Sequence, residues 1–359
     1  TFIVPNTLLF QNEYQNTRKL LSENNKLYAV INIGENVFER AQVPTCIFVA
    51  QKKMEDSYAI KYADFREIPN GDIVWGKYPQ SIEKAVLENT PGNVLGIDSA
   101  NSKIIEKIAS KSVLVDDIAD EVAAGISTGG NNVFIINEAF IQDNDIEKDI
   151  IKPLLYGKIV DRYSTDWNDE YVIYSTKNSN TPQYKNLYEY MLPFEEKLSK
   201  KRETKKGLIP WWSLHWPRTP ELFEQKKIVM RQTSDCIRAT IDMDNYYALN
   251  SLLVLTLKSN SEFSYEFVLG ILNSNVNNYI YSNLTQEAGR VFAEVKPKNV
   301  RKLYIPNMTN DERMKIEELV HQLLENNGTL DDIQREIDKM LYTYYGLEAE
   351  EIEKIEEVS

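Results

Sequence analysis

Cysteine and histidine are scarce in this chain. Its 359 residues contain two cysteines, Cys46 and Cys236, and two histidines, His215 and His321. Two distant cysteines provide neither a disulfide framework nor a cysteine-based zinc site, so we expect a reducing, cytoplasmic location. With so few histidines, no Cys-His or Ser-His-Asp arrangement can be assembled from the sequence.

Long apolar runs are also missing. No uninterrupted apolar stretch approaches the roughly 20 residues that a membrane-spanning helix needs, so we expect no membrane partner. The composition, with 42% hydrophobic and 26% charged residues, is that of a globular protein. The length favours two or three domains.

No nucleotide-binding loop is present. The glycine cluster Gly125-Ile126-Ser127-Thr128-Gly129-Gly130 lacks the Lys-Ser/Thr ending of a phosphate loop. It also precedes an expected strand, Val133 to Ile136, where a phosphate loop would precede a helix. We interpret the cluster as a tight turn.

Positive charge is concentrated in the middle of an acidic chain. The formal net charge is −13, but residues 152–310 carry 22 basic against 17 acidic side chains. Ten of these cations lie between Lys197 and Arg231, where only three acidic residues occur. A polyanion is a plausible partner for this stretch. The alternative is a solvated connector surface, which charge alone does not distinguish.

Three indoles lie beside the basic run, in Trp211-Trp212-Ser213-Leu214-His215-Trp216-Pro217-Arg218. Interleaved aromatic and cationic side chains suit nucleic acid, because rings pack on bases or sugars while cations neutralise phosphates. The alternative is a core corner, and we expect at least one of the three tryptophans to be buried. We expect His321, on an acidic helix, to be a surface residue.

Two short elements, Glu195-Glu196-Lys197 and Glu224-Gln225-Lys226, match the acidic-x-Lys pattern of metal-dependent nucleases. Such matches arise by chance in a chain rich in Glu and Lys. Neither follows a strand-borne Asp at a fitting distance, so we discount a nuclease site.

The expected fold class is α+β, with the margin of an α/β sheet, then a mixed α/β domain and a C-terminal helical hairpin. Expected strands cover residues 2–4, 27–33, 45–49, 170–176, 227–231, 236–241 and 252–257, and one helix covers 262–281. The region from Met54 to about Lys111 looks irregular. Thr309 with Glu312 opens one acidic helix, and Thr329 with Asp332 opens a second, which Gly346 ends.

Several segments, in their order along the chain, resemble the C-terminal part of TaqI-like DNA adenine-N6 methyltransferases, including the fused restriction-modification enzymes called type IIG. Those near the N-terminus are Phe2-Ile3-Val4-Pro5-Asn6, Gly34-Glu35-Asn36-Val37-Phe38 and Val43-Pro44-Thr45-Cys46-Ile47. Landmarks of the family's target-recognition domain are Gly125 to Gly129, Lys152 to Lys158, Trp211 to Arg218, Leu269 to Ser274 and Leu303 to Pro306. Tyr345-Gly346-Leu347 with Glu350-Glu351-Ile352 is similar to its C-terminal tail.

The resemblance implies four regions. They are the end of the methyltransferase α/β domain at 1–60, a connector at 61–111, a DNA target-recognition domain at 112–308 and an acidic helical tail at 309–359. The family's S-adenosylmethionine loop and its Asn-Pro-Pro-aromatic motif precede the part that this chain resembles, and neither occurs here. We therefore expect a DNA-reading module that binds no cofactor itself and is inactive alone. The full-length parent would use S-adenosylmethionine.

The resemblance also implies site residues. An aromatic residue of the family stacks on the extruded adenine, and Phe38 is its counterpart. Double-stranded DNA is the expected partner, together with missing N-terminal methyltransferase domains and, depending on the parent, a nuclease domain. The expected DNA-binding residues are Lys158, Lys200, Lys201, Arg202, Lys205, Lys206, Trp211, Trp212, His215, Trp216, Arg218 and Arg231.

Two other functions stay open at this point. The chain could be a stand-alone specificity subunit that recruits a separate methyltransferase through its acidic helices. It could also be a metal-dependent nuclease that uses the acidic-x-Lys elements.

Overall fold

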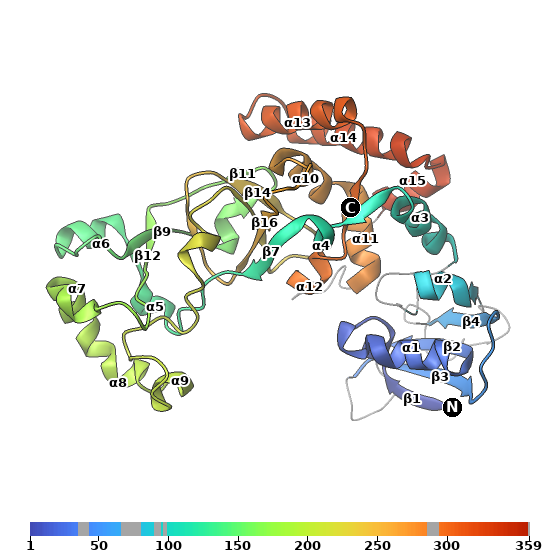
Figure 1. The fold of residues 1–359 in the computed structure, drawn as a ribbon, viewed down its shortest axis with the longest axis horizontal. Coiled ribbons are helices and arrows are strands. Elements are labelled where there is room, and N and C mark those ends of the chain that lie inside the picture. The colour runs from blue at the N-terminus through green and yellow to red at the C-terminus, as the bar shows by residue number, and fades with distance from the viewer. Residues whose placement is uncertain (35–42, 66–79, 90–94, 96–98, 286–293, 358–359) are drawn as a thin grey trace. The chain divides into compact units, whose positions relative to one another are not determined.

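The computed structural model describes residues 1–34, 43–65, 80–89, 95, 99–285 and 294–357 (Figure 1). The chain forms two compact units. Unit 1 comprises Thr1–Val113, Tyr279–Ala288 and Leu341–Ser359, and unit 2 comprises Leu114–Asn278 and Gly289–Met340. Within the described ranges, no helix is both long enough and apolar enough to cross a membrane.

Unit 1 is built on a five-stranded sheet with the order β1-β3-β2-β4-β5. Its strands are β1 (Phe2–Pro5), β2 (Lys26–Gly34), β3 (Thr45–Gln51), β4 (Ala59–Asp64) and β5 (Gln80–Glu83). Only the pairing of β2 with β4 is parallel. Helix α1 (Gln15–Glu23) precedes β2, whose Leu27 and Val30 are fully buried. The first three strands were predicted, with bounds that differ by a few residues.

The prediction that the stretch from Met54 to about Lys111 lacks regular secondary structure is wrong. It contains β4, β5, α2 (Lys84–Asn89) and α3 (Ser99–Ala109). In β4, buried Ile60 and Tyr62 alternate with exposed Ala59 and Lys61. This period of two is the signal of a half-buried strand, and it is short enough to be overlooked among turn residues.

Unit 2 contains two four-stranded sheets. The antiparallel sheet β14-β13-β16-β7 uses β7 (Ala119–Ala124), β13 (Lys227–Arg231), β14 (Ala239–Asp242) and β16 (Leu252–Leu257). The mixed sheet β15-β9-β12-β8 uses β8 (Ile135–Asn137), β9 (Ile151–Leu155), β12 (Glu170–Ile173) and β15 (Tyr247–Ala248). One apolar core joins them, since Val229 and Val254 belong to the same buried cluster as Ile136 and Leu154.

Helices and short strands complete the fold. They are β6 (Ser112–Leu114), α4 (Val115–Ile118), α5 (Asn131–Phe134), α6 (Glu138–Asp143), β10 (Val160–Asp161), β11 (Ser164–Thr165), α7 (Lys185–Met191), α8 (Glu195–Leu198), α9 (Arg202–Lys205), α10 (Tyr265–Leu272), α11 (Asn275–Thr285), α12 (Pro297–Val300), β17 (Tyr304–Pro306), α13 (Asn310–Leu324), α14 (Leu330–Tyr345) and α15 (Ala349–Glu356). Six short 3-10 segments occur in the described ranges, among them η4 (Gly157–Ile159) and η5 (Thr181–Gln183). The predicted α+β class is confirmed.

Two predictions of local structure are corrected. Val133 and Phe134 lie in helix α5 because their N–H groups both donate to the Gly130 carbonyl, at 2.9 and 3.2 Å. The predicted helix 262–281 is two helices, α10 and α11, separated at Asn273. The Asn273 side chain bonds both the N–H and the carbonyl of Ala239, each at 3.0 Å, which places this residue at a helix end.

Helices α13 and α14 begin where predicted, and α14 ends at the predicted glycine. Thr309 and Glu312 form a reciprocal capping box at α13. Gly346 follows α14 with a φ of +67°, the left-handed conformation that favours glycine. Helix α15, which follows, was not predicted.

Candidate nucleic-acid interface

The glycine cluster and the tryptophan run, far apart in sequence, form one structure in unit 2. The N–H of Ser127 donates to the Trp216 carbonyl at 3.0 Å, and the N–H of Trp216 donates to the Ser127 carbonyl at 2.8 Å. Gly129 has a φ of +72°, and a Cβ there would lie 2.9 Å from the Lys201 side chain and 3.0 Å from that of His215. Glycine is therefore required by both the conformation and the space. The cluster is a turn that holds the tryptophan run.

Lys201 fastens the start of helix α9 to this run. Its Nζ donates to the Ser213 carbonyl at 2.7 Å and lies 5.1 Å from the centre of the Phe134 ring. Burial lowers the pKa of Lys201 to about 8. Among the described lysines predicted to bind DNA, Lys201 is the one whose ammonium group donates a hydrogen bond to a backbone carbonyl.

His215 makes a second connection between α9 and the run. Its Nε2 lies 3.0 Å from a Glu203 carboxylate oxygen, and its Nδ1 lies 3.4 Å from Ser127 Oγ. Both ring nitrogens face protein groups, so the ring positions the loop. The sequence does not reveal this Ser-His-Glu contact because its members are far apart along the chain.

The three indoles have different environments. Trp211 is 8% exposed and packs 5.7 Å from the Tyr188 ring, between centroids. Trp212 packs edge-on against Trp211 at 5.5 Å. Trp216, in contrast, is 56% exposed, with the Arg218 guanidinium 5.8 Å from its ring centre. The expectation that at least one tryptophan is buried is confirmed, and Trp216 is the one that a ligand can reach.

Exposed cations surround α9. Lys200 pairs with Glu196 at 2.9 Å, but their side chains are 67% and 89% exposed, so the pair contributes little. Arg202, Lys205 and Lys206 are exposed and form no ion pair with any residue that the structure describes. These three side chains can meet phosphates without breaking an existing contact.

Lys158 and Arg231 lie elsewhere on unit 2. Lys158 is exposed on η4. Arg231 donates from Nε to the Val160 carbonyl and from Nη2 to Asp161 at 3.2 Å. Arg238 reaches the other Asp161 oxygen at 3.1 Å. These contacts attach the β10–β11 hairpin to β13, so Arg231, predicted to bind DNA, has a structural role.

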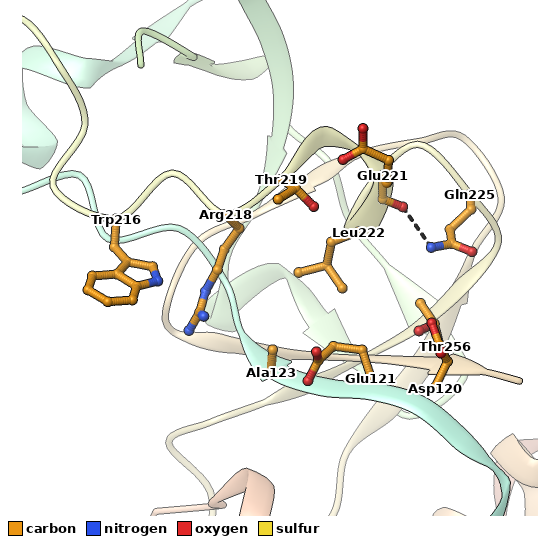
Figure 2. Close-up of a pocket in the computed structure, with 10 residues that line it drawn as sticks. All are labelled: Asp120, Glu121, Ala123, Trp216, Arg218, Thr219, Glu221, Leu222, Gln225 and Thr256. Atoms are coloured by element: carbon orange, nitrogen blue, oxygen red, sulfur yellow. Dashed lines mark hydrogen bonds between the residues drawn. The ribbon is translucent and has the colours of Figure 1, made fainter. Parts of the chain in front are cut away.

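Two hollows flank Trp216 and Arg218. The first, of about 370 Å³, is drawn in Figure 2, with Trp216 and Arg218 at one end. Its lining includes the acidic residues Asp120, Glu121 and Glu221. The second, of about 580 Å³, has no Asp or Glu in its lining, which includes Lys177, His215 and Arg218. The two hollows beside Arg218 therefore differ in the charge of the side chains that line them.

The acidic-x-Lys elements are engaged in other contacts. Glu224 accepts a hydrogen bond from the Tyr247 hydroxyl at 2.7 Å, and Lys226 pairs with Glu266 at 2.6 Å. The described part of the chain contains no group of three or more His, Cys, Asp or Glu side chains able to hold a metal ion.

Phe38, the predicted aromatic partner of an extruded adenine, lies outside the residues that the structure describes. Its role stays a prediction.

Comparison with known proteins gives two family matches. Residues 152–305 match the TaqI-like C-terminal specificity domain, and residues 1–71 match the N-6 DNA methylase family. Two regions of the chain are thus similar to an N-6 DNA methylase and to a TaqI-like specificity domain, in that order along the sequence. The specificity match contains the tryptophan run, α9, Lys158 and Arg231. The methylase match contains strands β1 to β4 of unit 1.

Two solved structures are similar to the chain. The type IIL restriction-modification enzyme MmeI, solved in complex with DNA, aligns with a TM-score of 0.53 and 13% identity, over 99% of this chain and 48% of that enzyme. The type IIG restriction endonuclease BpuSI aligns with a TM-score of 0.42 and 14% identity, over 96% of this chain and 46% of that one. The chain thus spans about half the length of either enzyme, and the likeness to MmeI concerns the fold.

Proposed function

We propose that this chain is the sequence-specific DNA recognition module of a DNA adenine-N6 methyltransferase from a restriction-modification system. The observation that carries the proposal is the surface formed by Arg202, Lys205, Lys206 and Trp216, named here the α9 surface. It combines cations that lack partners among the described residues with an exposed indole, inside the region that matches a specificity domain.

The α9 surface has the chemistry that duplex DNA requires. Cations neutralise phosphates and release counterions, and this term supplies most of the non-specific affinity. An exposed indole packs against sugars or bases. The anchors Lys201 and His215 hold both groups on one framework, so that little conformational entropy is lost on binding.

Unit 1 has a separate role in the proposal. It supplies the margin of the methyltransferase sheet and brings Phe38 to an adenine extruded from the duplex. The cofactor loop and the amine-holding motif belong to parts of the parent protein that this chain does not include, and the parent uses S-adenosylmethionine. A cytoplasmic location, favoured by two cysteines without a disulfide, belongs to the same proposal.

The salt dependence of duplex binding tests the proposal. For the chain as it stands, log Kobs should fall linearly with log salt concentration, by a slope of about 0.9 per phosphate neutralised. Replacing Arg202, Lys205 and Lys206 by Gln should flatten the slope by about 0.9 for each lost contact. Fluorescence anisotropy with a labelled duplex measures both.

The matched control removes three exposed cations elsewhere, Lys19, Lys52 and Lys315. This variant has the same net charge but should keep the slope of the unmodified chain. Equal slopes for both triple variants would mean that the effect is general electrostatics. The absence of duplex binding by the unmodified chain would refute the proposed function.

A further inference from the structure

A polar turn lies beside Trp216 and leaves two side chains without internal partners. Ser179 Oγ accepts from the Thr176 N–H at 3.0 Å, and Thr176 Oγ1 accepts from the Asn178 N–H at 3.2 Å. Two hydroxyl groups of the turn therefore accept hydrogen bonds from two of its own backbone N–H groups. The side chains of Lys177 and Asn178 are exposed, and neither forms a hydrogen bond or ion pair with the described part of the chain.

This turn and the tryptophan run line the same hollow. Lys177, Asn178, Trp216 and Arg218 are all in the lining of the 580 Å³ pocket, and these four residues are named here the Asn178 corner. Asp120, Glu121 and Glu221 line the other hollow, shown in Figure 2, and no carboxylate is in the lining of this pocket. The Asn178 corner therefore offers a polyanion two cations, Lys177 and Arg218, in a pocket without an acidic residue in its lining.

The backbone of the corner is fixed from several directions. The Leu214 N–H donates to the Ser175 carbonyl at 2.8 Å, which joins the tryptophan run to the strand before the turn. Arg218 has a φ of +59°, a left-handed conformation that costs energy for a residue other than glycine. The Tyr174 hydroxyl donates to the Arg218 carbonyl at 2.7 Å and stabilises that conformation.

Resting on the proposed function, we infer that the Asn178 corner reads one base of the recognition sequence. The Asn178 amide offers a donor and an acceptor side by side, which pair with N7 and N6 of adenine in the major groove. Trp216 packs against the neighbouring sugar or base. Lys177 and Arg218 neutralise the flanking phosphates. Adenine is therefore the base that we assign to this position.

Selection of duplexes from a random pool by the unmodified chain and by Asn178→Ala tests the inference. The unmodified chain should enrich a sequence with adenine at one position. The variant should bind the enriched duplex with discrimination reduced about 5- to 150-fold at that position alone, which is the range for one lost bidentate contact. Asn180→Ala, which removes an exposed amide just outside the pocket lining, is the matched control and should keep the full preference.

Trp216 provides an independent readout. Trp216→Ala should weaken binding to all duplexes by about 5- to 150-fold, and Trp216→Phe should retain more affinity because it keeps an aromatic face. Circular dichroism melting checks that both variants fold. Asn178→Asp, which replaces the amide donor by a charge, should lose the preference for adenine while the fold is unchanged.

The outcomes separate the inference from the function on which it rests. If the unmodified chain enriches a sequence and Asn178→Ala keeps the same preference at every position, the inference is wrong and the proposed function stands. A uniform loss of affinity in Asn178→Ala, with preference intact, also overturns base reading. If the unmodified chain binds no duplex, both fail.

Discussion

Breaking the buried ion pair between Lys227 and Asp242 should destabilise unit 2 strongly. The two residues face each other across strands β13 and β14, and their side chains are 0% and 1% exposed. Lys227 Nζ lies 2.5 Å from Asp242 Oδ2 and also donates to the Phe223 carbonyl at 2.5 Å. Burial lowers the pKa of Lys227 and raises that of Asp242, and the close contact compensates for this desolvation.

The expected magnitude follows from the burial. Lys227→Met leaves an uncompensated carboxylate, and Asp242→Leu leaves an uncompensated ammonium group. Each change should cost about 3 to 5 kcal/mol of the free energy of unfolding. That is a large part of the roughly 5 to 15 kcal/mol that stabilises a typical domain. The double variant should be far more stable than either single one, because replacing a whole buried pair by apolar groups is often nearly neutral.

Urea unfolding followed by tryptophan fluorescence measures these differences, since four of the five tryptophans lie in unit 2. A double-mutant cycle over the four proteins gives the coupling energy between the two side chains. The control is Lys200→Met, which breaks the exposed pair with Glu196 and should cost less than about 0.5 kcal/mol. Single variants at Lys227 and Asp242 that cost no more than this control would refute the reasoning.

Three further predictions concern the site and the cofactor. Burial lowers the pKa of Lys201 from 10.5 to about 8, so the folded state loses this proton at a lower pH than the unfolded state. The free energy of unfolding, measured in urea titrations and compared with that of Lys201→Gln, should therefore rise as the pH increases between these two values. A fall would contradict the assignment. In the full-length enzyme, Phe38→Ala should reduce methylation roughly ten- to a hundred-fold, and Trp should retain more activity than Ala. An unfolded variant or an unchanged rate would exclude the stacking role. The purified chain should not bind S-adenosylmethionine with micromolar affinity, because it lacks a glycine-rich cofactor loop; stoichiometric binding in calorimetry would disprove this.

The buried strands of unit 2 could be predicted from the sequence. Strand β13 has its predicted bounds because Ile228, Val229 and Met230 form an apolar run between charged residues. Strand β16 likewise matches its prediction, with five of its six residues buried. Both strands are covered on two faces, and a continuous apolar run is the signal of that environment.

Other elements depend on contacts that spacing does not reveal. The same kind of apolar run predicted a strand at Val133 and Phe134, which is wrong. The N–H groups of both residues donate to the Gly130 carbonyl and form a helical turn. The break between α10 and α11 depends on a bond between Asn273 and Ala239, which are distant in sequence. In such cases tertiary contacts override local preference.

The composition of the site could be predicted, but the roles of its members could not. Charge and aromatic content pointed to the segment around Trp211 to Arg218 and α9. Nothing in the sequence distinguishes Lys201, which bonds Ser213, from its exposed neighbours. The sequence also gives no sign that Asn178 and Trp216 line the same pocket. The predicted boundaries at residues 60, 111 and 308 stay predictions.

Exchange of the recognition unit tests the central claim most directly. Residues 152–305, the part that matches the specificity domain, would be replaced in the full-length enzyme by the corresponding segment of a relative that methylates a different sequence. Sequencing that detects N6-methyladenine would then map the modified sites in cellular DNA. We predict that the methylated adenine moves to the relative's sequence. Methylation that stays at the original sequence would contradict the account.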